Sequence, residues 1–144
     1  HLSLCLFAFY LSPATRAAGR SRSIFKMPAD KELPIIRAWY EFTVWLVPKI
    51  GKFPRDLRFT LGERVERKLF EILELLIRAR YTRDRTSLLE TANVELDILM
   101  YLLRAAHELK ALHSKAYGDA SVKLLEIGTQ LGGWKKSSQS KGAS

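Results

Sequence analysis

The stretch FPRDLRFTLGERVERKLFEILELLIRARYTRDR, residues Phe53–Arg85, decides the fold. Its apolar residues recur three or four positions apart, the spacing of one face of an α-helix. The main stripe consists of Leu61, Val65, Leu69, Ile72, Leu76 and Ala79, with Phe70, Leu73 and Ile77 beside it. This pattern predicts a helix from about Asp56 or Thr60 to Arg80, with one broad face buried. Gly62 lowers helix propensity near the start and indicates close approach by another backbone.

Three more segments with helical periodicity flank this stretch, and no alternating strand pattern is present. The expected helices run from Asp30 to the Pro48–Pro54 segment, from Thr82 or Asp84 to about His113, and from Ser114 to Gly132–Gly133. Proline, glycine and N-cap residues mark these boundaries. Four helices joined by short turns predict an all-α fold, an antiparallel up-down four-helix bundle.

The two ends of the chain differ from this bundle. Residues 1–26 contain an apolar run from Leu2 to Leu11 and no acidic residue, which resembles a truncated signal peptide. That run is too short to span a bilayer, which takes about 20 residues. We favour the alternative that Met27 is the physiological start and that residues 1–26 are a non-native upstream extension. The bundle is then expected over residues 27–136, and residues 137–144 are expected to be a disordered tail.

The charge of the chain is strongly basic. It has 24 Lys and Arg against 15 Asp and Glu, a formal net charge of +9. Such an excess favours a polyanion, an acidic protein surface or an anionic membrane as partner. The single cysteine, Cys5, excludes an intramolecular disulfide framework and a cysteine metal cluster. A reducing compartment, the cytoplasm, is expected, with no membrane association.

The sequence offers no candidate constellation of residues for nucleophilic catalysis. There is no G-x-S-x-G motif and no glycine-rich phosphate loop. Carboxylate-bridged metals in bundles need Glu-x-x-His pairs, but Arg104 and Lys110 stand three residues before His107 and His113. Both histidines are therefore expected on the helix surface. We expect a binding protein that is not an enzyme and uses neither a metal nor a cofactor.

The arginines of the Phe53–Arg85 stretch are the candidate binding residues, and the helix dipole divides them. A helix C-terminus favours cations, so helix termination alone can explain the arginines at the end of the second helix: Arg78, Arg80 and Arg83. A helix N-terminus disfavours cations. Arg55 and Arg58 nevertheless lie at the start of the second helix, and Arg85 lies at the start of the third. These last three are the better functional candidates. Antiparallel packing places Arg55 and Arg58 at the opposite end from Arg78–Arg85, where such charges can contact phosphates or acids of another subunit.

Aromatic residues accompany these charges. Phe59, Tyr81 and Trp134 lie near the arginines in the sequence or in the expected bundle. Aromatic residues at helical spacing usually pack in cores or interfaces, and base stacking is the alternative. We expect packing or interface roles for all three.

Five sequence segments together resemble a known family. They are FPRDLRFTLGERV from Phe53, LLIRARY from Leu75, LLETAN from Leu88, YLLRAAHELKAL from Tyr101 and EIGTQLGGWKK from Glu126. The chain resembles, from about Leu33 to Lys136, the accessory variability determinants (Avd) of diversity-generating retroelements. A related family, the four-helix proteins encoded by intervening sequences of some large-subunit rRNA genes, is the alternative, and the RFTLG and LGGW segments favour Avd.

The resemblance implies a four-helix bundle that assembles into a homopentameric barrel. It also implies binding to the element's reverse transcriptase and to its RNA and cDNA, in support of mutagenic reverse transcription. The matched basic positions are Arg55, Arg58, Arg64, Arg78, Arg83 and Arg104, with Trp134 as a packing or interface residue. Met100 stands where many relatives are expected to have a basic residue. A purely structural oligomeric bundle without a role on nucleic acid remains the second hypothesis.

Overall fold

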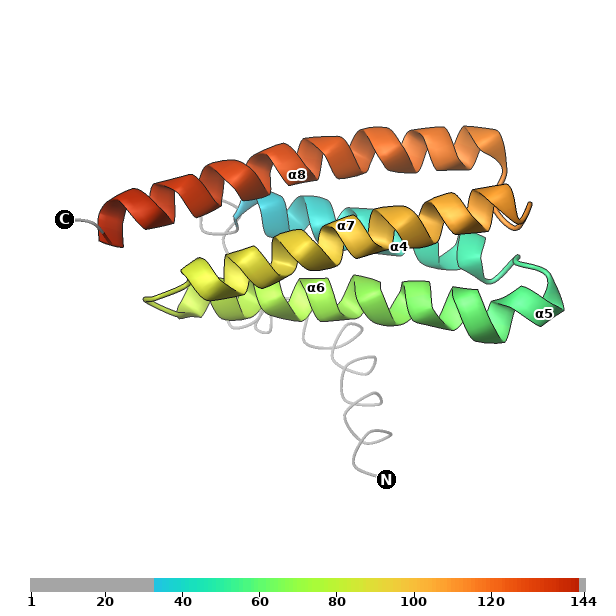
Figure 1. Cartoon of the computed structure of the whole chain (residues 1–144), viewed down its shortest axis with the longest axis horizontal. Helices are drawn as coiled ribbons and strands as arrows, with labels where there is room; N and C mark the ends of the chain where they lie inside the picture. The colour runs from blue at the N-terminus through green and yellow to red at the C-terminus, as the bar shows by residue number, and fades with distance from the viewer. Residues whose placement is uncertain (1–32, 143–144) are drawn as a thin grey trace, which may run out of the picture. The chain divides into compact units, whose positions relative to one another are not determined.

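The computed structural model describes residues 33–142. The regular secondary structure of these residues is entirely helical (Figure 1). The elements are α4 (Pro34–Ile50), α5 (Arg55–Leu57), the π-helix η1 (Arg58–Gly62), α6 (Glu63–Tyr81), α7 (Thr86–Glu108) and α8 (Ser114–Gly142). Each long helix packs against its neighbours in the chain, and α8 closes the bundle against α4. The expected antiparallel four-helix bundle is confirmed within these residues.

The core is built from the apolar stripes that the sequence predicts. The fully buried large side chains come from all four long helices: Trp39, Leu46, Ile50, Val65, Leu69, Ile72, Leu76, Leu89, Leu99, Leu103, Leu124 and Leu131. Trp39 is the largest of them, and its indole nitrogen donates a hydrogen bond to the Leu69 carbonyl at 2.9 Å. Burial of an indole is favourable when its N–H finds a partner, so this bond fixes α4 against α6.

The start of the second helix contains a π-helix that the sequence does not predict. The Glu63 amide donates to the Arg58 carbonyl five residues back, so this turn holds one residue more than an α-turn. In an unbroken α-helix Arg58, seven residues before the buried Val65, would lie on the core face. The extra residue shifts the phase. Leu57 is half-buried in its place, whereas Arg58 and Phe59 are exposed.

Gly62 ends the π-helix in a crowded position. A Cβ at Gly62 would lie 3.1 Å from Ile50 Cγ2 and 3.5 Å from Phe53 Cδ2. The expected close approach is therefore present, but side chains of the α4–α5 region make it and not a second backbone. A larger residue here would push against two buried side chains.

The third helix ends earlier than predicted. α7 stops at Glu108 and not near His113, because Lys110 takes the left-handed conformation with φ 63°. The Ala111 amide then donates to the Ala106 carbonyl at 2.8 Å, and the Lys110 amide to the His107 carbonyl at 3.0 Å. This pair of bonds is a Schellman motif, which normally places glycine where Lys110 stands. Such a stop leaves no glycine or proline signal in the sequence.

Two further expectations at helix ends are wrong. Neither Thr82 nor Asp84 caps α7, since its N-cap residue is Arg85 and no side chain caps it. The predicted stop at Gly132–Gly133 fails because α8 continues through both glycines, without a positive φ, to Gly142. A helical glycine costs about 1 kcal/mol relative to alanine, which weakens a helix but does not end it. Residues 137–142 of the expected disordered tail are thus helical, whereas residues 1–26 lie outside the described part.

The second helix buries less than its broad apolar face suggests. Phe70 is 50% exposed and Ile77 41% exposed, although the central stripe beside them is buried. α4, which packs against α6, adds Tyr40 and Val44, which are also exposed. These four residues are here called the α4/α6 apolar surface. Large exposed apolar groups of this kind are typical of protein interfaces.

Candidate nucleic-acid interface

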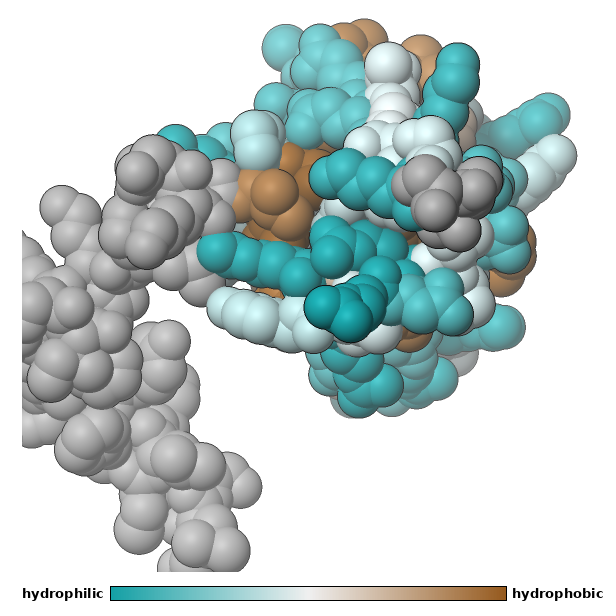
Figure 2. Space-filling model, turned by 90° about the vertical axis from the view of Figure 1, so that its left-hand side faces the viewer, coloured by the Kyte–Doolittle hydropathy of each residue, from teal (hydrophilic) through white to brown (hydrophobic). Residues whose placement is uncertain are grey.

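The turn between α6 and α7 carries a cluster of arginines, here called the arginine end. Arg78 and Arg83 are exposed, while Arg80 and Arg85 are half-buried. Figure 2 looks onto this side of the molecule and shows hydrophilic residues over the centre of the coloured surface, with apolar ones at its margins. The dipole of α6 favours cations here, so position alone does not make these arginines a binding site.

Two arginines of this end are held by rings. The Arg85 guanidinium lies 5.8 Å from the centroid of the Trp134 ring, and that of Arg80 5.4 Å from the Tyr81 ring. Arg85 is unfavourable at a helix start, and the contact with Trp134 on α8 offsets that cost. Trp134 is half-buried, as a packing residue should be. This contact could not be predicted from the helix dipole, because Arg85 and Trp134 are far apart in the sequence.

The predicted basic residues at the other end are less concentrated. Arg55 and Arg58 are exposed at α5 and η1, and Arg58 lies 5.6 Å from the ring of Phe59. Arg104 belongs to the last turns of α7, which approach the same end, and Arg64 to the first turn of α6. The eight predicted arginines are thus divided between the two ends of the bundle.

Some of the predicted arginines pair with acids of their own helix. Arg104 Nε lies 3.0 Å from Glu108 Oε1, and the hydrogen bond from Arg104 to this carboxylate raises the pKa of the guanidinium. Arg78 lies 3.8 Å from Glu74, and Arg67, which is not among the predicted residues, lies 3.1 Å from Glu63; both pairs join residues four apart on α6. Exposed pairs of this kind contribute little to stability. They leave most of each guanidinium open to a partner.

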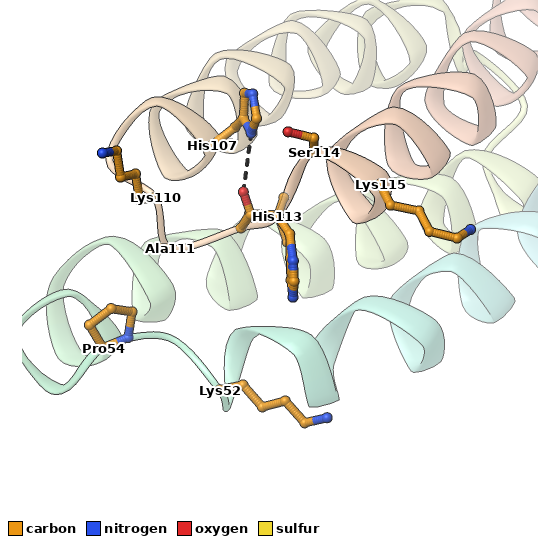
Figure 3. Close-up of a pocket in the computed structure, with 9 residues that line it drawn as sticks. Lys52, Pro54, His107, Lys110, Ala111, His113, Ser114 and Lys115 are labelled. Carbon is orange, nitrogen blue, oxygen red and sulfur yellow. Dashed lines mark hydrogen bonds between the residues drawn. The ribbon is translucent and has the colours of Figure 1, made fainter.

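A group of cations that sequence reasoning did not select lies where the α4–α5 turn meets the α7–α8 turn (Figure 3). A hollow of about 650 Å³ opens there, lined by Lys52, Pro54, His107, Lys110, Ala111, Leu112, His113, Ser114 and Lys115. None of these residues is acidic. The three lysines and His113 come from two turns that are about 60 residues apart in the chain. No local sequence motif could therefore predict that they lie together. We call this region the lysine hollow.

A second hollow of about 450 Å³ adjoins it and shares Lys52, His113 and Lys115. Trp45 and Lys49 of α4 extend its lining. Two ammonium groups lie over the Trp45 ring, Lys49 Nζ at 4.4 Å and Lys123 Nζ at 5.4 Å from its centroid. The carboxylate that lines this second hollow is Asp119, which accepts a bond from Lys115 at 3.3 Å.

The histidines have different surroundings from one another. His107 was expected on the helix surface but is half-buried, with its ring stacked on Tyr117 at 4.6 Å and Nδ1 3.1 Å from the Leu112 carbonyl. His113 is exposed in the turn before α8. No group of three or more metal-ligating side chains occurs among residues 33–142.

One ion pair joins two helices midway along the bundle. Lys68 on α6 bonds to Glu95 on α7 and lies 3.0 Å from Glu71, with only 19% of its side chain exposed. The bond to Glu95 is the main cause of a raised pKa for Lys68, and Glu71 adds to it. This pair fixes the alignment of two helices and is not placed to bind nucleic acid.

The aromatic residues predicted to pack or to form interfaces have separate surroundings. Phe59 is 65% exposed and Tyr81 70% exposed, at opposite ends of the η1–α6 segment. In this chain alone neither is a core residue. Their exposure fits an interface role better than a packing role.

Comparison with known proteins decides the family. A model of the bAvd-like family matches residues 33–138, which include α4, α6, α7 and most of α8. The chain belongs to the bAvd-like family. This confirms the resemblance found in the sequence. No curated protein matches the chain.

The bAvd-like family is a family of accessory proteins and not a known enzyme family. In this bAvd-like protein, none of the described helices is both long and apolar enough to cross a membrane. Membership points to an accessory role in a diversity-generating retroelement.

Proposed function

We propose that this bAvd-like protein is the accessory subunit of a diversity-generating retroelement that binds the reverse transcriptase and its template RNA and cDNA in the cytoplasm. The family match over residues 33–138 carries the proposal. The net charge of +9 and the cations exposed at both ends of the bundle support a polyanionic partner. The protein requires no cofactor for this role, because it contributes binding and not chemistry.

Homo-oligomerisation, as a pentamer, is part of the same proposal. The α4/α6 apolar surface supports it, since Tyr40 and Val44 on α4 are 58% and 54% exposed and Phe70 and Ile77 on α6 are 50% and 41% exposed. A ring of subunits would bury such a surface and would bring the basic ends of several chains together. Repetition of the charge would strengthen binding to a long RNA.

Salt dependence of RNA binding tests the electrostatic part of the proposal. The logarithm of the affinity should fall linearly with the logarithm of the salt concentration, with a slope of about −0.7 per phosphate contact on single-stranded RNA. Fluorescence anisotropy with a labelled template RNA measures this slope. Co-purification with the reverse transcriptase tests the second partner. Binding that is the same at about 50 and 200 mM salt would contradict the proposal.

The second candidate function is a structural bundle that assembles only with protein, and the exposed α4/α6 apolar surface favours it. Charge reversal separates the two. If these arginines serve only protein assembly, the triple variant Arg78→Glu, Arg83→Glu, Arg85→Glu should no longer form the oligomer, and RNA affinity should not be the first property affected. An intact oligomer that no longer binds RNA supports the accessory role. Sedimentation velocity and anisotropy on the same samples distinguish these results.

A further inference from the structure

The lysine hollow has the properties of a binding site that is separate from the predicted arginines. Its lining contains Lys52, Lys110, Lys115 and His113 and no carboxylate, so the charged side chains that line it are all cations. Hollows of one charge with low-dielectric walls concentrate the electric field. The buried Leu112 and the half-buried Ala111 supply such walls.

Lys110 occupies its position against the preference of the backbone. Its φ of 63° is in the left-handed region, where glycine is favoured and a side chain is strained. The Schellman motif needs that conformation but does not need a lysine. Strained non-glycine residues cluster at functional sites, and here the side chain adds a charge to the rim of the hollow (Figure 3).

The directions of the side chains indicate what shape of ligand fits. Figure 3 shows Lys110 at one side of the hollow, with Lys52 and Lys115 directed to the other and His113 projecting from the α7–α8 turn between them. Cations that diverge in this way do not surround one small anion. They fit a chain of phosphates that passes over the hollow, with the lysines as point charges along it.

Aromatic faces next to these charges favour a single strand. The second hollow, which Trp45 lines and which is here called the Trp45 groove, adjoins the lysine hollow and shares His113 with it. Trp45 is half-buried. Phe42 stacks on its ring at 5.9 Å between centroids and two ammonium groups lie over it, so the exposed part of the ring belongs to a strongly basic groove. Unpaired bases stack on such rings, whereas the bases of a duplex cannot reach them.

We propose that the lysine hollow and the adjoining Trp45 groove bind the phosphodiester backbone of single-stranded RNA. The inference rests on the proposed function, and it assigns RNA binding to residues other than the predicted arginines. RNA contacts the turns at the α4–α5 and α7–α8 end, with Lys52, Lys110 and Lys115 on phosphates and Trp45 beside a base.

The test compares two variants of equal net charge in the full chain. The hollow variant is Lys52→Gln with Lys110→Gln, and the matched control is Arg67→Gln with Lys136→Gln, both exposed and outside the lining of the two hollows. The probe is a short fluorescein-labelled single-stranded oligouridylate, measured by anisotropy between about 50 and 200 mM salt. The hollow variant should bind on the order of tenfold more weakly, with a salt slope reduced by about 1.4, and the control should remain within about twofold of wild type.

The outcomes separate this inference from the proposed function. If the wild type binds no RNA, the proposed function fails and the inference fails with it. If the wild type binds but both variants weaken equally, net charge alone acts and only the inference is overturned. If the hollow variant keeps RNA but loses the reverse transcriptase, the hollow binds an acidic protein surface, which also overturns it.

Lys110→Gly distinguishes loss of the site from loss of the fold. Glycine relieves the left-handed strain, so the melting temperature should rise by about 3 °C while RNA affinity falls. A Trp45 fluorescence change on addition of oligouridylate, absent in Trp45→Phe, is expected in the wild type and should be smaller in Lys110→Gly. Unchanged affinity in Lys110→Gly together with no Trp45 response would overturn the assignment.

Discussion

The two ends of the bundle are both basic, but their charges are held differently. At the arginine end Arg80 and Arg85 lie against aromatic rings, and Arg78 faces Glu74. At the lysine hollow the lining cations have Asp119 as their nearby acid, and only Lys115 bonds to it. The arginine end therefore uses part of its charge to hold helices together, whereas the lysine hollow keeps its charge for a partner.

The largest expected effect concerns stability at the arginine end. Trp134→Ala removes the half-buried ring on which Arg85 lies and should lower the free energy of unfolding by about 2 kcal/mol, less than a fully buried tryptophan would cost. Urea unfolding of the variant measures this, with Lys136→Ala as the exposed control on the same helix. A loss below about 0.5 kcal/mol would mean that the contact between Trp134 and Arg85 does not stabilise the bundle.

The next effect compares the two ends directly in RNA binding. Arg78→Gln with Arg83→Gln should weaken binding of oligouridylate about threefold, because one of the two guanidinium groups already faces Glu74. Lys52→Gln with Lys110→Gln should weaken it about tenfold. Anisotropy titrations at one salt concentration suffice. A larger loss of RNA affinity in the arginine variant than in the lysine variant would contradict the difference inferred between the two ends.

A smaller effect has the opposite sign. Lys110→Gly should raise the free energy of unfolding by about 1 kcal/mol, since the left-handed conformation no longer carries a Cβ. Differential scanning calorimetry detects it, and Lys52→Gly, outside any left-handed position, is the control that should not stabilise. An unchanged or lower stability in Lys110→Gly would show that the turn is not strained.

The smallest effect lies midway between the ends, at Lys68. Its pKa is raised in the folded state, chiefly by the bond to Glu95, so its contribution is complete below the unfolded pKa of about 10.5 and is lost as pH rises through the higher folded value. The free energy of unfolding should therefore fall between pH 9 and about 11, and it should fall less in Glu95→Gln. An identical pH dependence in Glu95→Gln and wild type would exclude the pair as its source.

The sequence predicted the architecture well because the apolar stripes are periodic and strong. The stripe from Leu89 to Ala106 is buried throughout, as is the one through Leu69 and Leu76. Helix ends were predicted less well. Lys110 stops α7 through its backbone conformation alone, and Gly132 does not stop α8, so neither boundary follows from residue type.

The site was harder to predict because it depends on which turns meet. Arg55 to Arg85 are contiguous in one stretch and attract notice, whereas Lys52, Lys110 and Lys115 come together only through the antiparallel packing. The exposure of Phe70 and Ile77 could not be predicted either, since their spacing is the same as that of core residues. Periodicity identifies apolar faces but not which faces stay uncovered in one chain.

The π-helix at Arg58–Gly62 has a consequence for comparing lengths among relatives. One residue removed from this turn would restore ordinary α-helical winding and would place Leu57 seven residues before Val65, on the core side where it already lies. Arg58 would then be six residues before Val65 and would stay off the core face. We expect relatives with a one-residue gap here to keep an apolar residue in the place of Leu57 and a polar one in the place of Arg58, because the extra residue is accommodated without turning the segment before it.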